Sequence, residues 1–155
     1  MKRLASLALA LVSCLAVVPA MAQEHWTDGP VWEVSFYQTK PGKFDDYVKW
    51  LRGNYLSFVA EEKKQGLILD SKVFINSARN SPSDWDICVA TLFSSYGKAL
   101  DYSASDEEKM KAIASKQFKT PDEQKQQEMT APRFQMREYL GTKFIREVTL
   151  KPLAH

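Results

Sequence analysis

The spacing of apolar residues changes once between Pro30 and Gly66. Over residues 31–39 bulky side chains alternate along the chain, which is typical of a strand. Lys40-Pro41-Gly42 cannot continue that strand, because Pro41 has no N–H group and Gly42 favours a turn. Apolar residues then recur every three or four positions, which predicts one long amphipathic helix that ends at Gly66. Its apolar stripe comprises Phe44, Tyr47, Val48, Leu51, Tyr55, Phe58 and Val59.

The same two spacings recur in the rest of the chain. Alternation predicts strands over 67–76 and 85–93, joined by a loop at 77–84, and a last strand over 143–151 that follows a stop at Gly141. A short helix is expected to begin at Ser94 or Ser95. In the polar segment 103–129, the pair Ser105 and Glu108 predicts one helix start, and Thr120-Pro121 predicts another.

This order of elements predicts an α+β fold. Strand–helix–strand–strand–helix–strand, with a helical insert before the last strand, is the split βαβ or ferredoxin-like pattern: a four-stranded antiparallel sheet with helices on one face. The opposite face is then uncovered. The pattern places Val31, Tyr37, Val73 and Ile75 on that uncovered face. They are too apolar for water, so we expect two sheets to pack face to face in a homodimer.

One segment resembles a known superfamily. The motif Val-x-Phe-Tyr-x-x-Lys-Pro-Gly-Lys-Phe-Asp-Asp-Tyr, from Val34 to Tyr47, is similar to the start of the dimeric α/β-barrel proteins. These include antibiotic-biosynthesis monooxygenases, stress-responsive barrel proteins and NIPSNAP-like domains. The resemblance covers most of residues 31–150. It implies the ferredoxin-like fold, but the superfamily contains cofactor-free oxygenases, haem-degrading enzymes, isomerases and proteins without known activity.

Residues 1–22 have the pattern of a signal peptide. Lys2 and Arg3 precede an apolar core, and Ala20-Met21-Ala22 is a small-x-small cleavage site. We therefore expect a periplasmic or secreted protein, with an extended lead-in at 23–30, the domain at 31–151 and a tail at 152–155. The minor alternative is a lipoprotein, because Leu11-Val12-Ser13-Cys14 resembles a lipobox with Cys14 as the lipidated residue.

Charge and cysteine content exclude several classes of function. Removing Lys2 and Arg3 takes the formal net charge from +2 to 0, which leaves no electrostatic footprint for nucleic acid or an anionic membrane. After cleavage Cys88 is the remaining cysteine, so an intramolecular disulfide is excluded. Cys88 lies in an apolar run and is expected to be a buried, inert thiol.

Metal and cofactor sites are not predicted. Beyond residue 22 the histidines are His25 and His155, near the two ends, which argues against a haem-ligating histidine on a helix and against a zinc site. We interpret the carboxylate pairs Asp45-Asp46, Glu61-Glu62 and Glu107-Glu108 as solvated helix faces, because adjacent residues on a helix point in different directions.

Two residues are candidates for catalysis. Glu33 is in the middle of a strand, with Tyr37 four positions later, and a buried carboxylate there could act as a base with a raised pKa. The alternative for Glu33 is an ion pair with Arg146, Lys72 or a residue of a partner chain. Because the superfamily holds apolar ligands between sheet and helices, the resemblance also implies a ligand pocket with the candidates Trp32, Tyr37, Tyr55 and Trp85.

Two hypotheses about function therefore stay open. We favour a non-catalytic binding or structural homodimer with a pocket for a small apolar or aromatic molecule, because the sequence contains no recognisable catalytic set. The alternative is a cofactor-independent monooxygenase or isomerase that acts on a small aromatic substrate.

Overall fold

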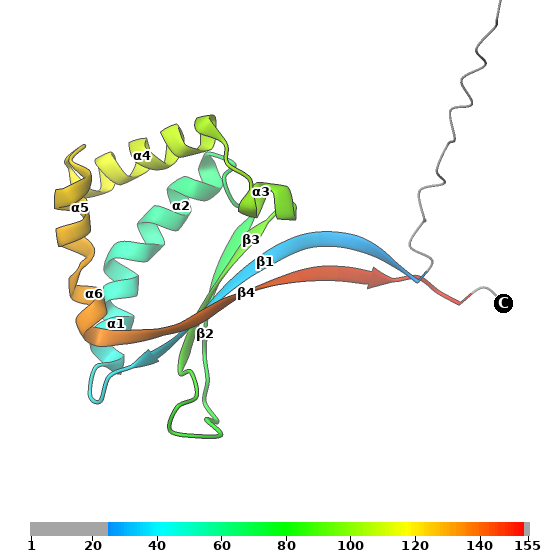
Figure 1. Cartoon of the computed structure of the whole chain (residues 1–155), viewed down its shortest axis with the longest axis horizontal. Helices are drawn as coiled ribbons and strands as arrows, with labels where there is room; N and C mark the ends of the chain where they lie inside the picture. Colours follow the sequence, from blue (N-terminus) through cyan, green and yellow to red (C-terminus); the bar gives the residue numbers. More distant parts are fainter. Residues whose placement is uncertain (1–24, 154–155) are drawn as a thin grey trace, which may run out of the picture.

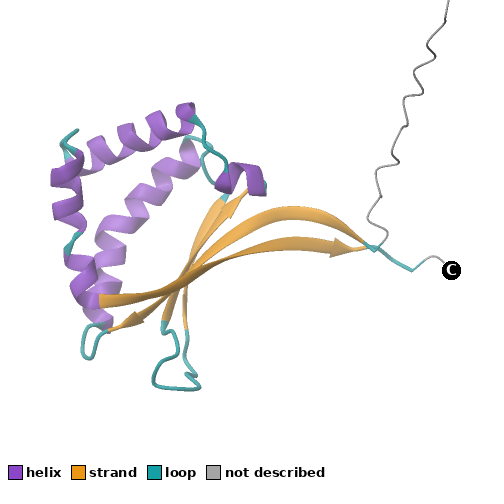
Figure 2. Cartoon of the chain, viewed as in Figure 1, coloured by secondary structure: helices purple, strands orange, loops and turns teal. Residues whose placement is uncertain are grey.

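The computed structural model describes residues 25–153 of the chain. These residues form an α+β fold in which helices lie on one face of a four-stranded antiparallel sheet (Figures 1 and 2). The predicted signal peptide at 1–22 and the alternative lipidation site at Cys14 lie outside the described residues. None of the helices within 25–153 is long and apolar enough to cross a membrane.

The sheet has the strand order β2-β3-β1-β4, and every pair of neighbours is antiparallel. Its members are β1 (Trp26–Thr39), β2 (Asp70–Ile75), β3 (Ile87–Phe93) and β4 (Arg137–Leu150). Val34 of β1 faces Ala90 of β3 on one side and Lys143 of β4 on the other. The two longest strands are therefore neighbours, and β1 is internal.

The extended lead-in predicted at 23–30 forms the first part of β1 from Trp26 onwards. Trp26 to Asp28 pair with Leu150 to Val148. A Cβ atom added to Gly29 would lie 3.0 Å from the carbonyl oxygen of Glu147, so the glycine lets the two backbones approach closely. Together β1 and β4 form a ribbon that extends past the helices (Figure 1).

The predicted stop at Gly141 is also wrong. β4 begins at Arg137 and runs through Gly141, whose φ of 136° is open to glycine and rarely adopted by other residues. Opposite it, the pairing of β1 with β4 shifts register between Phe36 and Tyr37. The glycine thus marks an irregularity inside the strand rather than its end.

The long helix predicted after the Pro-Gly corner is confirmed. It consists of α1 (Phe44–Trp50), a π-helical turn η1 (Leu51–Tyr55) and α2 (Leu56–Lys64), with helical backbone angles at both junctions. Gly66, at φ 69°, ends it as expected. The N–H of Leu67 donates to the carbonyl of Glu62 (3.0 Å), and that of Gly66 donates to Lys63 (3.1 Å), which is the Schellman pattern.

The remaining helices are α3 (Tyr96–Leu100), α4 (Ala104–Phe118), α5 (Glu123–Thr130) and α6 (Pro132–Met136). The cap at Ser95 is confirmed, since its hydroxyl accepts from the N–H of Lys98. The other two predicted caps are wrong. Ser103 rather than Ser105 caps α4, and Asp122 rather than Thr120 caps α5. In both cases another short polar side chain two residues away reaches the free N–H groups instead.

The helices cover the face of the sheet that was predicted to be uncovered. Tyr37 packs edge-on against Tyr47 of α1, and strand register places Val31, Val73 and Ile75 on the same helix-covered side. The uncovered face carries Trp32, Val34, Phe36, Phe74, Cys88, Ala90, Leu92 and Ile145. The alternation of side chains along a strand assigns them to two faces. Both faces carry bulky side chains here, so the alternation does not reveal which face the helices cover.

Two clusters of buried side chains hold the helices on the sheet. Tyr47 and Leu51 pack with Ile87 of β3, whereas Val59 packs with Leu67, Ile68 and Ile113 of α4. Cys88 is buried, as predicted.

Leu51→Ala should destabilise the protein by about 2–5 kcal/mol, because it removes a buried side chain and leaves a cavity. Leu56→Ala, on the same helix at a side chain that is 57% exposed, is the matched control and should cost less than about 0.5 kcal/mol. Urea unfolding followed by circular dichroism measures both. Equal losses would contradict the described orientation of the helix.

Candidate functional site

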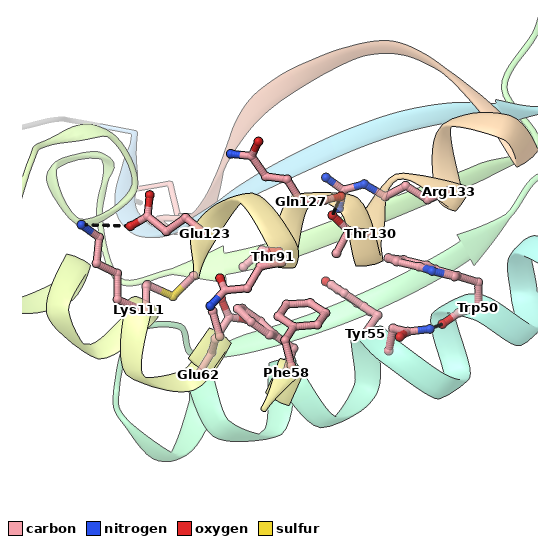
Figure 3. Close-up of a pocket in the computed structure, with 15 residues that line it drawn as sticks. Trp50, Tyr55, Phe58, Glu62, Thr91, Lys111, Glu123, Gln127, Thr130 and Arg133 are labelled. Carbon is pink, nitrogen blue, oxygen red and sulfur yellow. Dashed lines mark hydrogen bonds and ion pairs between the residues drawn. The ribbon is translucent and has the colours of Figure 1, made fainter. Parts of the chain in front are cut away.

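A cavity of about 570 Å³ lies between the long helix, the helical insert and the sheet. Helix residues Trp50, Tyr55 and Phe58 line one side, and Gln127 and Thr130 of α5 lie opposite (Figure 3). Thr91 of β3 lines it from the sheet. The volume is within the usual range for small-molecule sites, about 300–1,000 Å³. Its lining also includes Asn54, Glu62, Met110, Lys111, Ala114, Phe118, Glu123, Gln126 and Arg133.

The long helix presents two parallel rows of side chains. Tyr47, Leu51, Tyr55 and Val59 face the core, and Trp50, Asn54, Phe58 and Glu62 line the cavity. A spacing of four residues drifts by about 40° per step around a regular α-helix. The wider π-helical turn at Leu51–Tyr55 offsets part of this drift, so that each row stays on one side over three turns.

Glu62 is the acidic group at one end of the cavity. Burial raises its pKa to about 7, and the nearby charge of Glu33 adds to this rise. Burial also raises the pKa of Glu33. Within residues 25–153 neither carboxylate has a basic partner at ion-pair distance. Near neutral pH the pair can therefore hold a proton.

Arg133 is the basic group at the other end of the cavity. Its guanidinium lies 6.0 Å from the ring centroid of Trp50 and 4.9 Å from that of Phe134. The Nε atom is buried and has no hydrogen-bond partner among the described residues. Burial lowers the pKa of Arg133, and the neighbouring charge of Arg137 lowers it further.

Tyr55 lines the cavity on the side next to the sheet. Its hydroxyl lies 2.6 Å from the Oγ of Ser71 on β2. Burial raises the pKa of the phenol, so it stays neutral and acts as a fixed polar group. On the outer side, Lys111 of α4 and Glu123 of α5 form an ion pair at 3.4 Å (Figure 3).

Of the four aromatic residues predicted for a pocket, Tyr55 lines this cavity and three do not. Trp32 lies on the uncovered face of the sheet, where its Nε1–H donates to Glu147 at 2.5 Å. Trp85 packs against Phe36 on that same face, with 5.5 Å between ring centroids. Tyr37 lies on the covered face, but its ring is packed between Tyr47, Tyr139 and the guanidinium of Arg137.

The two catalytic candidates are brought to the same face of β1 but not to one point. Glu33 and Tyr37 are four strand residues apart, which separates them by about 13 Å. Glu33 lies near Glu62 instead. Among residues 25–153 the predicted ion pair of Glu33 with Arg146 or Lys72 is not formed, because Arg146 pairs with Asp28 and Lys72 lies over the ring of Trp32 on the other face.

Sequence reasoning missed Glu62 and Arg133. Glu62 was interpreted as part of a solvated face, yet it lines the cavity. A signal for it exists, because Trp50, Asn54, Phe58 and Glu62 recur at every fourth position beside the core stripe. Arg133 carries no such signal, since its position depends on how the insert folds back over the helix.

Among residues 25–153 no group of three or more His, Cys, Asp or Glu side chains is arranged to hold a metal ion. Compared with known protein families the chain matches none of them, and no curated protein is similar to it in sequence. The cavity and its polar groups therefore carry the functional argument.

Glu62→Gln should flatten the dependence of stability on pH. Because the folded state raises the pKa of Glu62 from 4.5 to about 7, it binds more protons than the unfolded state between these values. The free energy of unfolding of the wild type should thus fall as the pH rises through this window. At pH 8 the variant should be more stable by about 1–2 kcal/mol, a value reduced for partial exposure.

The matched control is Glu61→Gln, one residue away, where the carboxylate lies outside the cavity and pairs with Lys116 at 3.4 Å. Its profile should run parallel to that of the wild type. Thermal melting between pH 4.5 and pH 8 measures all three proteins. A Glu62→Gln profile with the slope of the wild type would exclude the raised pKa.

Proposed function

We propose that this chain is a small-molecule binding protein that holds an apolar or aromatic ligand in the cavity between sheet and helices. The observation that carries the proposal is the aromatic lining of Trp50, Tyr55, Phe58 and Phe118 around a volume of about 570 Å³. Filling such a surface with an apolar molecule releases water from it, which is the main driving force for binding of this kind.

The proposal includes the ferredoxin-like arrangement of the dimeric α/β-barrel superfamily. It is supported by the strand order β2-β3-β1-β4 with β1 internal, which a split βαβ unit requires. The motif from Val34 to Tyr47 supports it independently.

We further propose that two copies pair through the uncovered face of the sheet. Phe74 and Ile145 on this face are 48% and 49% exposed, and Trp32, Val34 and Phe36 lie beside them. The β1–β4 ribbon adds Trp26 and Leu150, with exposed fractions of 37% and 76%. Because an isolated two-stranded ribbon is only marginally stable in water, contact with a second copy would stabilise it.

A second candidate function is proton transfer by a cofactor-independent oxygenase or isomerase. It is favoured by the raised pKa of Glu62 beside Glu33, since a general base works best with a pKa near the operating pH. Turnover of a small aromatic substrate by the purified protein, lost in Glu33→Gln or Glu62→Gln, would establish this function in place of simple binding.

Ala114→Phe should block the cavity, because Ala114 of α4 lines it. Isothermal titration calorimetry with 4-biphenylmethanol and 4-biphenylcarboxylate should detect binding of at least one probe by the wild type. The variant should bind it at least about 10-fold more weakly. Ala112→Phe, on the same helix at an exposed position, is the control and should bind as the wild type does. If the wild type binds neither probe at millimolar concentration, the proposed function is wrong.

Phe74→Asp should convert the proposed dimer into a monomer, because a charge on the uncovered face would be buried without a partner. Light scattering at micromolar concentration should give twice the mass of one chain for the wild type. The control Leu56→Asp, exposed on the helical side, should remain a dimer. A monomeric wild type would rule out pairing through the sheet.

A further inference from the structure

Arg133 is a positive charge without a counter-ion among residues 25–153. Among the described residues no acidic side chain lies at ion-pair distance from it, and its buried Nε has no hydrogen-bond partner. Its contacts are with the faces of two aromatic rings, those of Trp50 and Phe134. A partly buried guanidinium with an unmade hydrogen bond is unfavourable, so this end of the cavity is suited to an anion.

The side chains around Arg133 also favour an anion at this end of the cavity. Arg137 is close enough for its charge to act on Arg133. Among the described residues Arg137 itself contacts phenols and no carboxylate: its Nη1 donates to the hydroxyl of Tyr47, and its guanidinium lies 3.5 Å from the ring centroid of Tyr37. The nearest lining carboxylate on α5, that of Glu123, is paired with Lys111. The local potential is therefore positive.

The other charged end of the cavity differs in one respect. In the part of the chain that the structure describes, Glu33 and Glu62 also have no ion-pair partner, which would suit an organic amine. A carboxylate, however, can relieve its own charge by binding a proton. A guanidinium cannot lose its proton near neutral pH. The charge that only a ligand can compensate is therefore that of Arg133.

The side chains that line the cavity next to Arg133 determine the chemical character of the rest of the ligand. Trp50 lies directly under the guanidinium, and Tyr55, Phe58 and Phe118 continue the apolar surface away from it. A carboxylate placed on the fork of Arg133 would direct an attached ring along this row. Two parallel N–H donors fit a carboxylate better than they fit a neutral oxygen.

We propose that the cavity binds an organic anion, an apolar or aromatic carboxylic acid whose carboxylate pairs with Arg133 and whose body lies along Trp50, Tyr55 and Phe58. This inference rests on the proposed function and specifies the chemical class of its ligand. It makes Arg133 the residue that determines specificity for charge, while the aromatic row accepts any flat apolar body.

The test compares three probes with the same ring system and different charge: 4-biphenylcarboxylate, 4-biphenylmethanol and 4-biphenylmethylamine. Calorimetry at pH 7 should show the wild type binding the carboxylate about 10- to 100-fold more tightly than the alcohol, the range of a charge-assisted bidentate contact. In Arg133→Gln the affinity for the carboxylate should fall to that of the alcohol, and the affinity for the alcohol should not change.

Two further variants separate a specific contact from a structural effect. Arg133→Lys keeps the charge without the fork and should retain part of the preference. Arg52→Gln removes an exposed cation of the long helix, away from α6, and should leave all three affinities unchanged. Thermal melting checks that each variant is folded.

The outcomes are distinguishable. If the wild type binds alcohol and carboxylate equally, or if Arg133→Gln keeps the preference, the assignment of Arg133 is wrong while the binding cavity stands. Tighter binding of the amine would overturn the assignment in favour of the Glu33–Glu62 end. Binding of none of the three would overturn the proposed function together with this inference.

Discussion

Tyr47 is the side chain at which the separate parts of this fold meet. It is fully buried, and burial raises the pKa of its phenol, so the hydroxyl stays neutral and accepts a hydrogen bond from Arg137 at the start of β4. Its ring meets Tyr37 of β1 edge-on and stacks on Trp50 at 6.1 Å. The contact with Trp50 links the core to the cavity, because Trp50 is the first residue of the row that lines the cavity. Loss of Tyr47 would thus disturb the core, the β1–β4 edge and the site together.

The cavity exists because the helical insert packs on the long helix instead of on the sheet. Ile113 anchors α4 against Val59, and α6 returns to the other end of the helix, where Arg133 covers Trp50. Between these two contacts lies α5, which has no buried residue and is rich in glutamine. A helix without an apolar face does not bury side chains in the core. The side chains of α5 therefore leave the space between α5 and the long helix unfilled. The polar composition of α5 is therefore a cause of the site.

Much of the fold follows from periodicity, and most of the site does not. The alternation at 31–39 and the apolar stripe from Phe44 to Val59 predicted β1 and the long helix, because burial of one face imposes those spacings. The choice between the two faces of the sheet was wrong, since Tyr37 and Phe36 are equally bulky. The prediction of a solvated face for Glu62 rested on the different directions of adjacent side chains on a helix, whereas the environment of Glu62 is set by the insert. The position of Arg133 depends on the packing of α6 against the long helix, which no local sequence pattern predicts.

The two polar ends of the cavity make different demands on a ligand. Trp50, beneath Arg133, and Glu62 are twelve residues apart on the same helix, which corresponds to about 18 Å along its axis. A short aromatic carboxylate held on Arg133 would contact the row from Trp50 to Phe58 and would not reach Glu62, so Glu62 could not remove a further proton from it. A substrate for proton transfer would have to extend along the whole row, or bind without using Arg133. Anion binding and base catalysis in this cavity are therefore separable by the length of the molecule, because the helix that positions both groups also sets the distance between them.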